Sequence, residues 1–137
     1  MKFENINKFK INKGCVIWIT GLSGAGKTTL AKKIGNNLKK IGVPNILIDG
    51  DVMRNIISVN KNNESFTNES RKEMAFKYSQ ISSELANQGF CVITSVIGMF
   101  EDIYTWNRKN LPGYFEVFLD IPLQILKKRD NKGIYKK

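Results

Sequence analysis

Residues 21–28 of this chain have the types and the spacing of a phosphate-binding loop. They read Gly-Leu-Ser-Gly-Ala-Gly-Lys-Thr, which fits the pattern G-x-x-x-x-G-K-[ST]. Glycines let successive backbone N–H groups turn towards a polyphosphate, and a helix that starts behind them adds partial positive charge. The pattern therefore predicts that the chain binds a nucleoside triphosphate. The residues expected to contact it are Gly21, Leu22, Ser23, Gly24, Ala25, Gly26, Lys27, Thr28 and Thr29.

Two side chains at the end of this loop could act on the reacting groups themselves. Lys27 can reach the β- and γ-phosphates, and the hydroxyl of Thr28 can ligate Mg²⁺. We therefore expect Lys27 to be catalytic and Thr28 to be a metal ligand. The alternative is a chance glycine-rich turn between a strand and a helix.

The elements on either side of the loop argue against chance. The apolar run at 16–19 predicts a buried strand over about 15–20, and the residues after the loop predict a helix that ends near Lys40. A strand, the loop and a helix in that order are what phosphate binding requires. Further patterns predict strands at 45–49, 90–97 and 114–120, and helices that include 52–57, span 69–87 and 101–110, and begin at Pro122.

Strands that alternate with helices predict an α/β fold, a doubly wound parallel sheet with helices on both faces, as in P-loop kinases. In such a fold, ligands bind at the carboxyl ends of the strands. The glycine-rich loop, the triplet Asp49-Gly50-Asp51 and Gly98 each follow a predicted strand. We therefore expect all three to lie at the same edge of the sheet.

Length and composition limit the other possibilities. A chain of 137 residues is expected to form a single domain over 1–137. It has no apolar stretch near the roughly 20 residues of a membrane span, and 1–14 lack the apolar core of a signal peptide, so we expect a cytoplasmic protein with no membrane partner. The net charge of +10 suggests nucleic acid as a partner, but the lysines are spread out and do not alternate with aromatic residues, so none is expected. Cys15 and Cys91 each open a predicted strand, which favours packed, reduced thiols.

Six segments together resemble the adenylylsulfate (APS) kinase family across nearly the whole chain. They are WITGLSGAGKTTLA (18–31), IDGDVMR (48–54), FTNESR (66–71), ANQGFCVITSVI (86–97), FEVFLDIPL (115–123) and KKRDNKGIYKK (127–137). The resemblance implies an enzyme that moves the γ-phosphoryl group of ATP to the 3′-hydroxyl of a small nucleotide, with Mg²⁺ as a cofactor. It also implies a homodimer.

The resemblance assigns roles to the residues after the second strand. Asp51 matches the second aspartate of the family's D-G-D and is expected to be catalytic: it could orient the acceptor hydroxyl, act as a base or hold a metal-bound water. Asp49 is expected near the metal, directly or through water. Arg54 would grip the acceptor's phosphate. The alternatives are turn formation or helix capping for the two aspartates, and a solvated surface position for Arg54.

The remaining matches place further residues at the two substrates. Phe66 and Arg71 match substrate-site positions, with Phe66 either facing the nucleobase or filling the core, and Ile97 matches the isoleucine of the family's I-S-P. The last segment matches the family's mobile lid, in which Arg129 would lie against ATP and Lys132 would reach phosphates across the site.

Departures from the family gather on the acceptor side. The family's E-N-I-R-R has Met74 in place of asparagine and Phe76 in place of the first arginine, and its I-S-P has Gly98 and Met99 as the second and third residues. All four are expected to touch the acceptor pocket. Losing polar partners from a nucleotide site changes its selectivity. We therefore expect the acceptor to be cytidine diphosphoramidate, the substrate of a relative of APS kinases on the route to capsule phosphoramidate, and adenylylsulfate is the alternative.

Two other classes of function are less consistent with the sequence. A GTP switch would need an N-K-x-D element, which the tetrapeptides at 107–110 and 131–134 do not provide. A protein acting on polynucleotide ends would bind oligonucleotides with a steep salt dependence. The family also continues past K-G-x-Y-K-K into an F-T-G segment and a last strand, so we expect this chain to be a fragment that lacks them; the alternative is a naturally short chain.

Overall fold

The computed structural model describes residues 14–57, 67–130 and 133–135. They form four strands and five helices in the order β1 (Cys15–Thr20), α1 (Lys27–Lys40), β2 (Asn45–Asp49), α2 (Gly50–Ile57), α3 (Asn68–Asn87), β3 (Cys91–Val96), α4 (Glu101–Asn110), β4 (Tyr114–Phe118) and α5 (Leu123–Lys128). Each predicted element is present.

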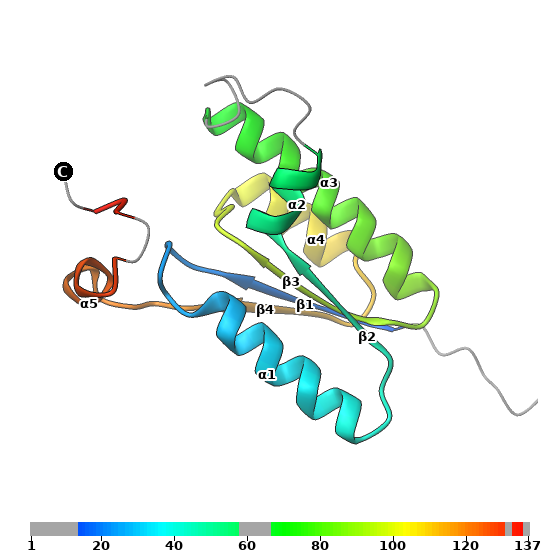
Figure 1. Cartoon of the computed structure of the whole chain (residues 1–137). Helices are drawn as coiled ribbons and strands as arrows, with labels where there is room; N and C mark the ends of the chain where they lie inside the picture. The colour runs from blue at the N-terminus through cyan, green and yellow to red at the C-terminus, as the bar shows by residue number, and fades with distance from the viewer. Residues whose placement is uncertain (1–13, 58–66, 131–132, 136–137) are drawn as a thin grey trace, which may run out of the picture.

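The four strands form one parallel sheet in the order β2-β3-β1-β4. Helix α1 packs against one face of the sheet, and α3 and α4 lie on the other (Figure 1). The central strand β3 is buried along its whole length, as its continuous apolar run predicts for a strand covered on both faces. The doubly wound α/β prediction is confirmed.

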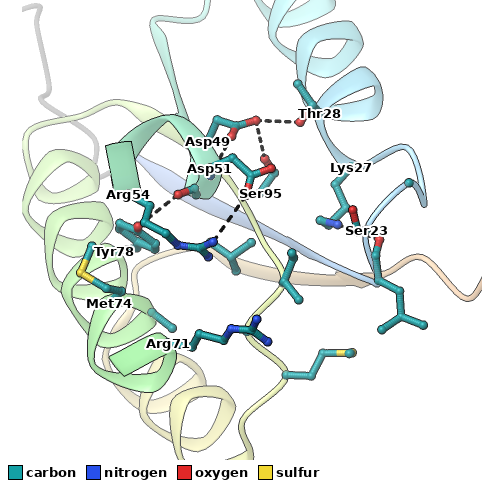
Figure 2. A pocket seen from close by; sticks show the side chains of 18 of the residues that line it. Ser23, Lys27, Thr28, Asp49, Asp51, Arg54, Arg71, Met74, Tyr78 and Ser95 are labelled. Atoms are coloured by element: carbon teal, nitrogen blue, oxygen red, sulfur yellow. Dashed lines mark hydrogen bonds and ion pairs between the residues drawn. The ribbon is translucent and has the colours of Figure 1, made fainter. Parts of the chain in front are cut away.

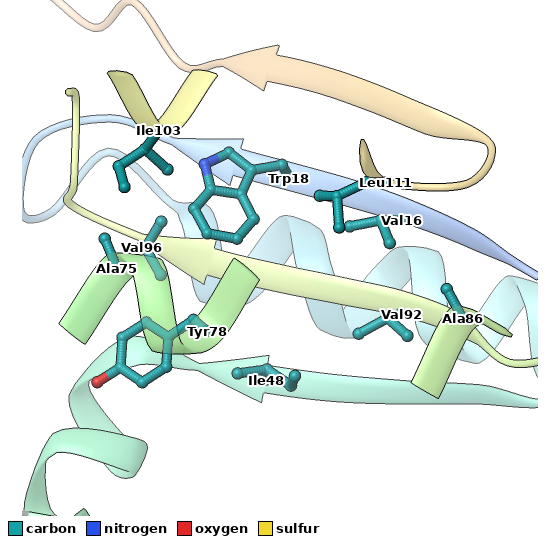
Figure 3. Close-up of a cluster of buried hydrophobic side chains, with 10 residues drawn as sticks. All are labelled: Val16, Trp18, Ile48, Ala75, Tyr78, Ala86, Val92, Val96, Ile103 and Leu111. Atoms are coloured by element: carbon teal, nitrogen blue, oxygen red, sulfur yellow. The ribbon is translucent and has the colours of Figure 1, made fainter. Parts of the chain in front are cut away.

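Side chains of β1 alternate between two apolar cores because successive strand residues point to opposite faces. Val16 and Trp18 pack towards α3 and α4 with Tyr78 and Ile103 (Figure 3). The next residue of the strand, Ile19, packs on the other face with members of α1 and β3. Trp18 has an exposed fraction of 0%, and burying a large apolar side chain of this kind contributes roughly 1.5–3 kcal/mol.

Several boundaries differ by one or two residues from the predicted ones, and a capping bond and strand pairing explain two of them. Helix α3 begins at Asn68 because the Thr67 side chain accepts a bond from the backbone N–H of Ser70. Strand β4 ends at Phe118, not at residue 120, because its only described neighbour in the sheet, β1, ends at Thr20. Strand β3 runs over 91–96 instead of 90–97.

The carboxyl ends of the strands meet at one edge, where the loop after β1, the Asp49–Asp51 turn and the segment after β3 lie together, as predicted. Among the residues that the structure describes, none of the helices has the length and apolar character to span a membrane.

Candidate active site

The loop between β1 and α1 takes its shape from glycines in the left-handed region. Gly24 has φ +81° and Gly26, which precedes the first residue of α1, has φ +95°. Other residues rarely adopt these angles. The Ala25 N–H donates to the Leu22 carbonyl at 3.1 Å, so the loop turns back on itself and enters the helix. This is the geometry expected of a phosphate-binding loop.

The two reactive side chains of the loop point in different directions. Lys27 Nζ donates to the carbonyl of Leu22 at 2.8 Å and so lies over its own loop. Thr28 Oγ1 donates to Asp49 Oδ2 at 2.6 Å, which joins the start of α1 to the end of β2 (Figure 2). Because β2 and β1 are separated by β3 in the sheet, this bond spans the width of the site.

The Asp49 side chain accepts hydrogen bonds through both of its carboxylate oxygens. Its Oδ1 accepts from the backbone N–H groups of Asp51 at 3.0 Å and Val52 at 3.2 Å, which caps α2. Its Oδ2 accepts from Thr28 and, at 3.5 Å, from Ser95. A carboxylate oxygen beside a threonine hydroxyl is a donor set that suits Mg²⁺, which prefers hard oxygen ligands. Asp49 therefore combines helix capping with a position suited to a metal site.

Asp51 and Arg54 lie one helical turn apart at the start of α2. Arg54 Nη1 is 4.0 Å from Asp51 Oδ1. The side chain of Arg54 is 23% exposed and that of Asp51 is 46% exposed. Both line the same cavity as the glycine-rich loop. A carboxylate and a guanidinium therefore face the space in front of Lys27 and Thr28 (Figure 2).

This cavity has a volume of about 570 Å³ and contains most of the residues predicted from the sequence. Those that line it are Leu22, Ser23, Gly24, Gly26, Lys27, Thr28, Thr29, Asp49, Asp51, Arg54, Arg71 and Ile97. Gly21 and Ala25 are buried beneath the loop and do not line the cavity. Arg129 follows α5 as an exposed residue outside the cavity lining. Phe66 and Lys132 lie outside the described residues.

Three of the four acceptor-side departures line the cavity, and the expectation for Phe76 was wrong. Met74, Gly98 and Met99 are in the lining. Phe76 instead packs edge-on against Trp106 of α4, with ring centroids 5.1 Å apart. Two residues correspond to about 200° around a helix, so Met74 faces the cavity while Phe76 faces α4.

The glycine at position 98 has a packing reason. A Cβ atom there would lie 3.0 Å from the Cβ of Ala75 and 3.4 Å from the ring of Phe100. The segment after β3 therefore rests directly on α3, and a side chain at this position would push the two apart. The close contact brings the segment that includes Met99 beside the acceptor wall, the face of α3 that lines the cavity with Arg71, Met74 and Tyr78.

Sequence reasoning missed the site roles of Tyr78 and Ser95. Tyr78 Oη donates to the Gly50 carbonyl at 3.2 Å, and the side chain is 3% exposed. Burial raises the pKa of Tyr78; Arg54 opposes this, and Asp51 and Asp49 add to it, so the hydroxyl stays protonated at neutral pH. No motif of the sequence points to Tyr78, which lies within the helix predicted over 69–87. For Ser95, a hydroxyl near the carboxyl end of an otherwise apolar strand was an available signal.

The segment after α5 touches the glycine-rich loop. Tyr135 Oη donates to the Ser23 carbonyl at 2.8 Å. The Asp130 carboxylate accepts from the backbone N–H groups of Ile134 at 2.8 Å and Tyr135 at 3.0 Å. The end of the described chain is thus positioned next to the ATP side of the cavity.

A glycine-rich loop at the carboxyl edge of a parallel sheet, joined through its threonine to a carboxylate of β2, defines a P-loop kinase fold. The chain belongs to the adenylylsulphate kinase family, whose model matches residues 13–137. It is an ATP-dependent nucleotide kinase.

Individual proteins that are similar to the chain in sequence or structure also support this family assignment. The chain is 36% identical over 126 residues to the cytidine diphosphoramidate kinase of Campylobacter jejuni, covering 92% of this chain and 72% of that protein. It is 36% identical over 138 residues to the adenylyl-sulfate kinase of Clostridium acetobutylicum, covering 100% of this chain and 68% of that protein. Among solved structures, the Mycobacterium tuberculosis APS kinase in complex with AMPPNP and APS matches with a TM-score of 0.81 and 32% identity, over 91% of this chain and 73% of that one.

Proposed function

We propose that this chain transfers the γ-phosphoryl group of ATP to the 3′-hydroxyl of cytidine diphosphoramidate. The observation that carries the proposal is that Asp51 and Arg54 line one cavity with Lys27 and Thr28. A carboxylate for an acceptor hydroxyl and a guanidinium for an acceptor phosphate therefore face the loop that would hold ATP. Phosphoryl transfer needs little covalent chemistry from the protein beyond this positioning and neutralisation of charge.

Each of these residues has a role in the proposed reaction. Lys27 leaves the Leu22 carbonyl, binds the β- and γ-phosphates and stabilises the charge that develops on the transferred group. Thr28 and Asp49 would hold Mg²⁺, and the ion would supply positive charge against the negative charge of the phosphates. Asp51 orients the acceptor hydroxyl and takes its proton, and Arg54 binds the acceptor's phosphate.

The choice of acceptor rests on the pocket and not on overall identity. The cytidine diphosphoramidate kinase and the adenylyl-sulfate kinase compared above are equally similar to the chain, at 36%. Met74, Gly98 and Met99 line the cavity where APS kinases carry an asparagine, a serine and a proline. Nucleotide sites discriminate through paired hydrogen bonds, so a wall without these polar groups favours an acceptor other than adenylylsulfate.

Five further residues and the oligomeric state belong to the same proposal. Arg71 and Ile97 line the cavity and contact the acceptor. Phe66, which lies outside the described residues, is assigned to the nucleobase of the acceptor. Arg129 and Lys132 act on ATP and its phosphates from the segment after α5, which Tyr135 joins to the loop. The active form is a homodimer.

The test is a competition between both acceptors in one reaction, with the new phosphate located by phosphorus NMR. We expect kcat/KM for cytidine diphosphoramidate to exceed that for adenylylsulfate by at least about a hundredfold, or roughly 2.7 kcal/mol. The Lys27→Ala variant is the matched control: its turnover should fall below about a tenth of the wild-type value with either acceptor, because its charge acts on the phosphates in both cases. Equal or greater use of adenylylsulfate would instead assign the chain as an APS kinase.

A further inference from the structure

We propose that Tyr78 of α3 is a positioning residue that fixes the catalytic turn Asp49–Asp51 through its hydroxyl and so joins the acceptor wall to the catalytic carboxylate. The inference rests on the proposed function, because it assigns Tyr78 an effect through Asp51. Nothing in the D-G-D motif itself points to this residue, which follows it by 27 positions and belongs to another helix.

The turn is held from two sides. On one side, Tyr78 Oη donates to the Gly50 carbonyl, and Gly50 stands between the two aspartates. On the other side, Gly50 lies against β3, where an added Cβ atom would be 3.2 Å from the carbonyl oxygen of Ser95 and 3.2 Å from a methyl group of Val96. The backbone before Asp51 therefore has little freedom to move between α3 and β3.

The same face of α3 forms the acceptor side of the cavity. Arg71, Met74 and Tyr78 follow one another at spacings of three and four residues, so they share one stripe of the helix, and all three line the cavity. Figure 2 shows this stripe opposite the glycine-rich loop, with Tyr78 beside the start of α2. A shift of α3 would therefore move the acceptor and the catalytic turn together.

The hydroxyl is suited to a structural bond and not to proton transfer. The pKa of Tyr78 is raised, mainly by burial, which keeps the phenol protonated and acting as a donor. Misplacement of a reacting group by about 1 Å can cost about a hundredfold in rate. Losing the bond should therefore lower kcat without changing how tightly either substrate binds.

The first experiment compares Tyr78→Phe with the wild-type protein in steady-state kinetics. The ring and its packing in the core remain, and only the donor is lost. We expect kcat to fall about tenfold, equivalent to about 1.4 kcal/mol, while KM for ATP and for the acceptor stays within about twofold. Tyr114→Phe is the matched control: Tyr114 also has a hydroxyl in hydrogen bonds, but it opens β4 at the opposite edge of the sheet, and its loss should leave kcat unchanged.

A double-mutant cycle separates positioning from a general loss of structure. In an Asp51→Asn background, Tyr78→Phe should cause no further loss of kcat, because the carboxylate it positions is already gone. Multiplicative losses would overturn the proposal, and so would a wild-type kcat for Tyr78→Phe alone. If Asp51→Asn itself keeps full turnover, the proposed role of Asp51 fails and the role of Tyr78 fails with it.

Folding is checked independently so that every result can be interpreted. Far-ultraviolet circular dichroism and the Tm of each variant are measured, and kinetics are taken well below the lowest Tm of the set. If Tyr78→Phe is unstable even there, the steady-state cycle is repeated at a lower temperature with both substrates saturating, because bound substrates stabilise the folded state. A kcat that recovers to the wild-type value under these conditions would show a stability effect only and overturn the proposal.

Discussion

At the scale of single residues, Asp49 shows that one carboxylate can cap a helix and also contact the glycine-rich loop region. One oxygen accepts two backbone N–H groups of α2, and the other accepts the hydroxyls of Thr28 and Ser95. Sequence reasoning treats capping as the alternative to a site role because either explains an aspartate after a strand. A carboxylate has about four acceptor positions, so a single residue can begin a helix and still line the cavity beside the glycine-rich loop.

Substitutions of Asp51 and Asp49 should therefore have different effects, mainly on turnover for Asp51 and also on stability for Asp49. Asp51→Asn keeps the shape of the side chain and deletes its charge, so we expect turnover to fall at least about a hundredfold with little change in ATP affinity or unfolding free energy. Asp49→Ala removes the cap of α2, so its unfolding free energy should fall by about 1 kcal/mol in addition to any loss of activity.

These outcomes are measured by steady-state kinetics, titration with a nonhydrolysable ATP analogue and denaturant unfolding. Asp49→Asn is the control, because asparagine is also a good cap and should restore most of the stability lost in Asp49→Ala. If Asp51→Asn keeps full turnover, Asp51 has only a structural role.

The limits of sequence reasoning at this scale follow from geometry. The glycine-rich loop and Asp49, Asp51 and Arg54 were predicted as candidates because their motifs are local. Tyr78 could not be predicted in its role, since its partner Gly50 becomes a neighbour only after α3 packs on the sheet. Phe76 was expected in the pocket because it stands where the family's E-N-I-R-R motif has its first arginine, but the turn of the helix directs it to α4.

At the scale of elements, parallel pairing of β1 with β3 places Cys15 directly opposite Cys91. Both thiols are free among the described residues, as expected, and Cys91 is the more buried of the two. Burial raises the pKa of Cys91 to about 12, and the neighbouring Cys15 adds to the shift. The register of two strands thus determines the chemistry of a side chain far from the active site.

A thiol-labelling experiment tests this consequence. The thiolate is the reactive form, so Cys91 should remain unmodified by iodoacetamide in the folded protein at mildly alkaline pH and react fully in denaturant. Peptide mass spectrometry identifies the site, and Cys91→Ser is the control for assignment. Rapid alkylation of Cys91 in the native state would contradict the buried register pair.

The raised pKa of Cys91 also determines how the free energy of unfolding changes with pH. Because the folded-state pKa of Cys91 is about 12 and the ordinary value is 9.0, the unfolded chain loses its proton first as the pH rises. The contribution of this thiol to the free energy of unfolding is fully present below about pH 9 and is lost progressively as the pH rises towards about 12.

The elements themselves were predictable because strands alternate with helices and the core faces repeat with the correct period. The strand order β2-β3-β1-β4 was not predicted, since no local pattern encodes which strands pair. Ends of elements were also imprecise, as at Thr67, where a capping bond extends α3 by one residue at its start.

At the scale of the whole molecule, two cores on opposite faces of one sheet support the active-site edge. Trp18 is central to the larger core and lies on the strand that leads into the glycine-rich loop. Its Nε1 atom is buried and has no hydrogen-bond partner among the described residues. The side chain therefore stabilises the fold through apolar packing, while its N–H group contributes nothing favourable.

Substitutions of Trp18 should distinguish the apolar packing of its ring from the effect of its unpaired N–H group. Trp18→Ala leaves a large cavity and should lower the unfolding free energy by about 3–5 kcal/mol. Trp18→Phe keeps an aromatic ring in the core and also removes the unpaired donor. We therefore expect its loss of unfolding free energy to be less than half of that for Trp18→Ala. Urea unfolding followed by circular dichroism measures both, and equal losses for the two variants would contradict the packing account.

The position of Trp18 also gives the molecule an internal optical reporter. The chain has two tryptophans, Trp18 and Trp106, and the second lies on α4 in edge-on contact with Phe76. With Trp106 replaced by phenylalanine, the emission of the protein would come from one indole that is fully shielded from water and sits three residues before Gly21. Nucleotide capture at the loop and loss of the surrounding core could then be followed in real time from a single native chromophore, without an attached dye.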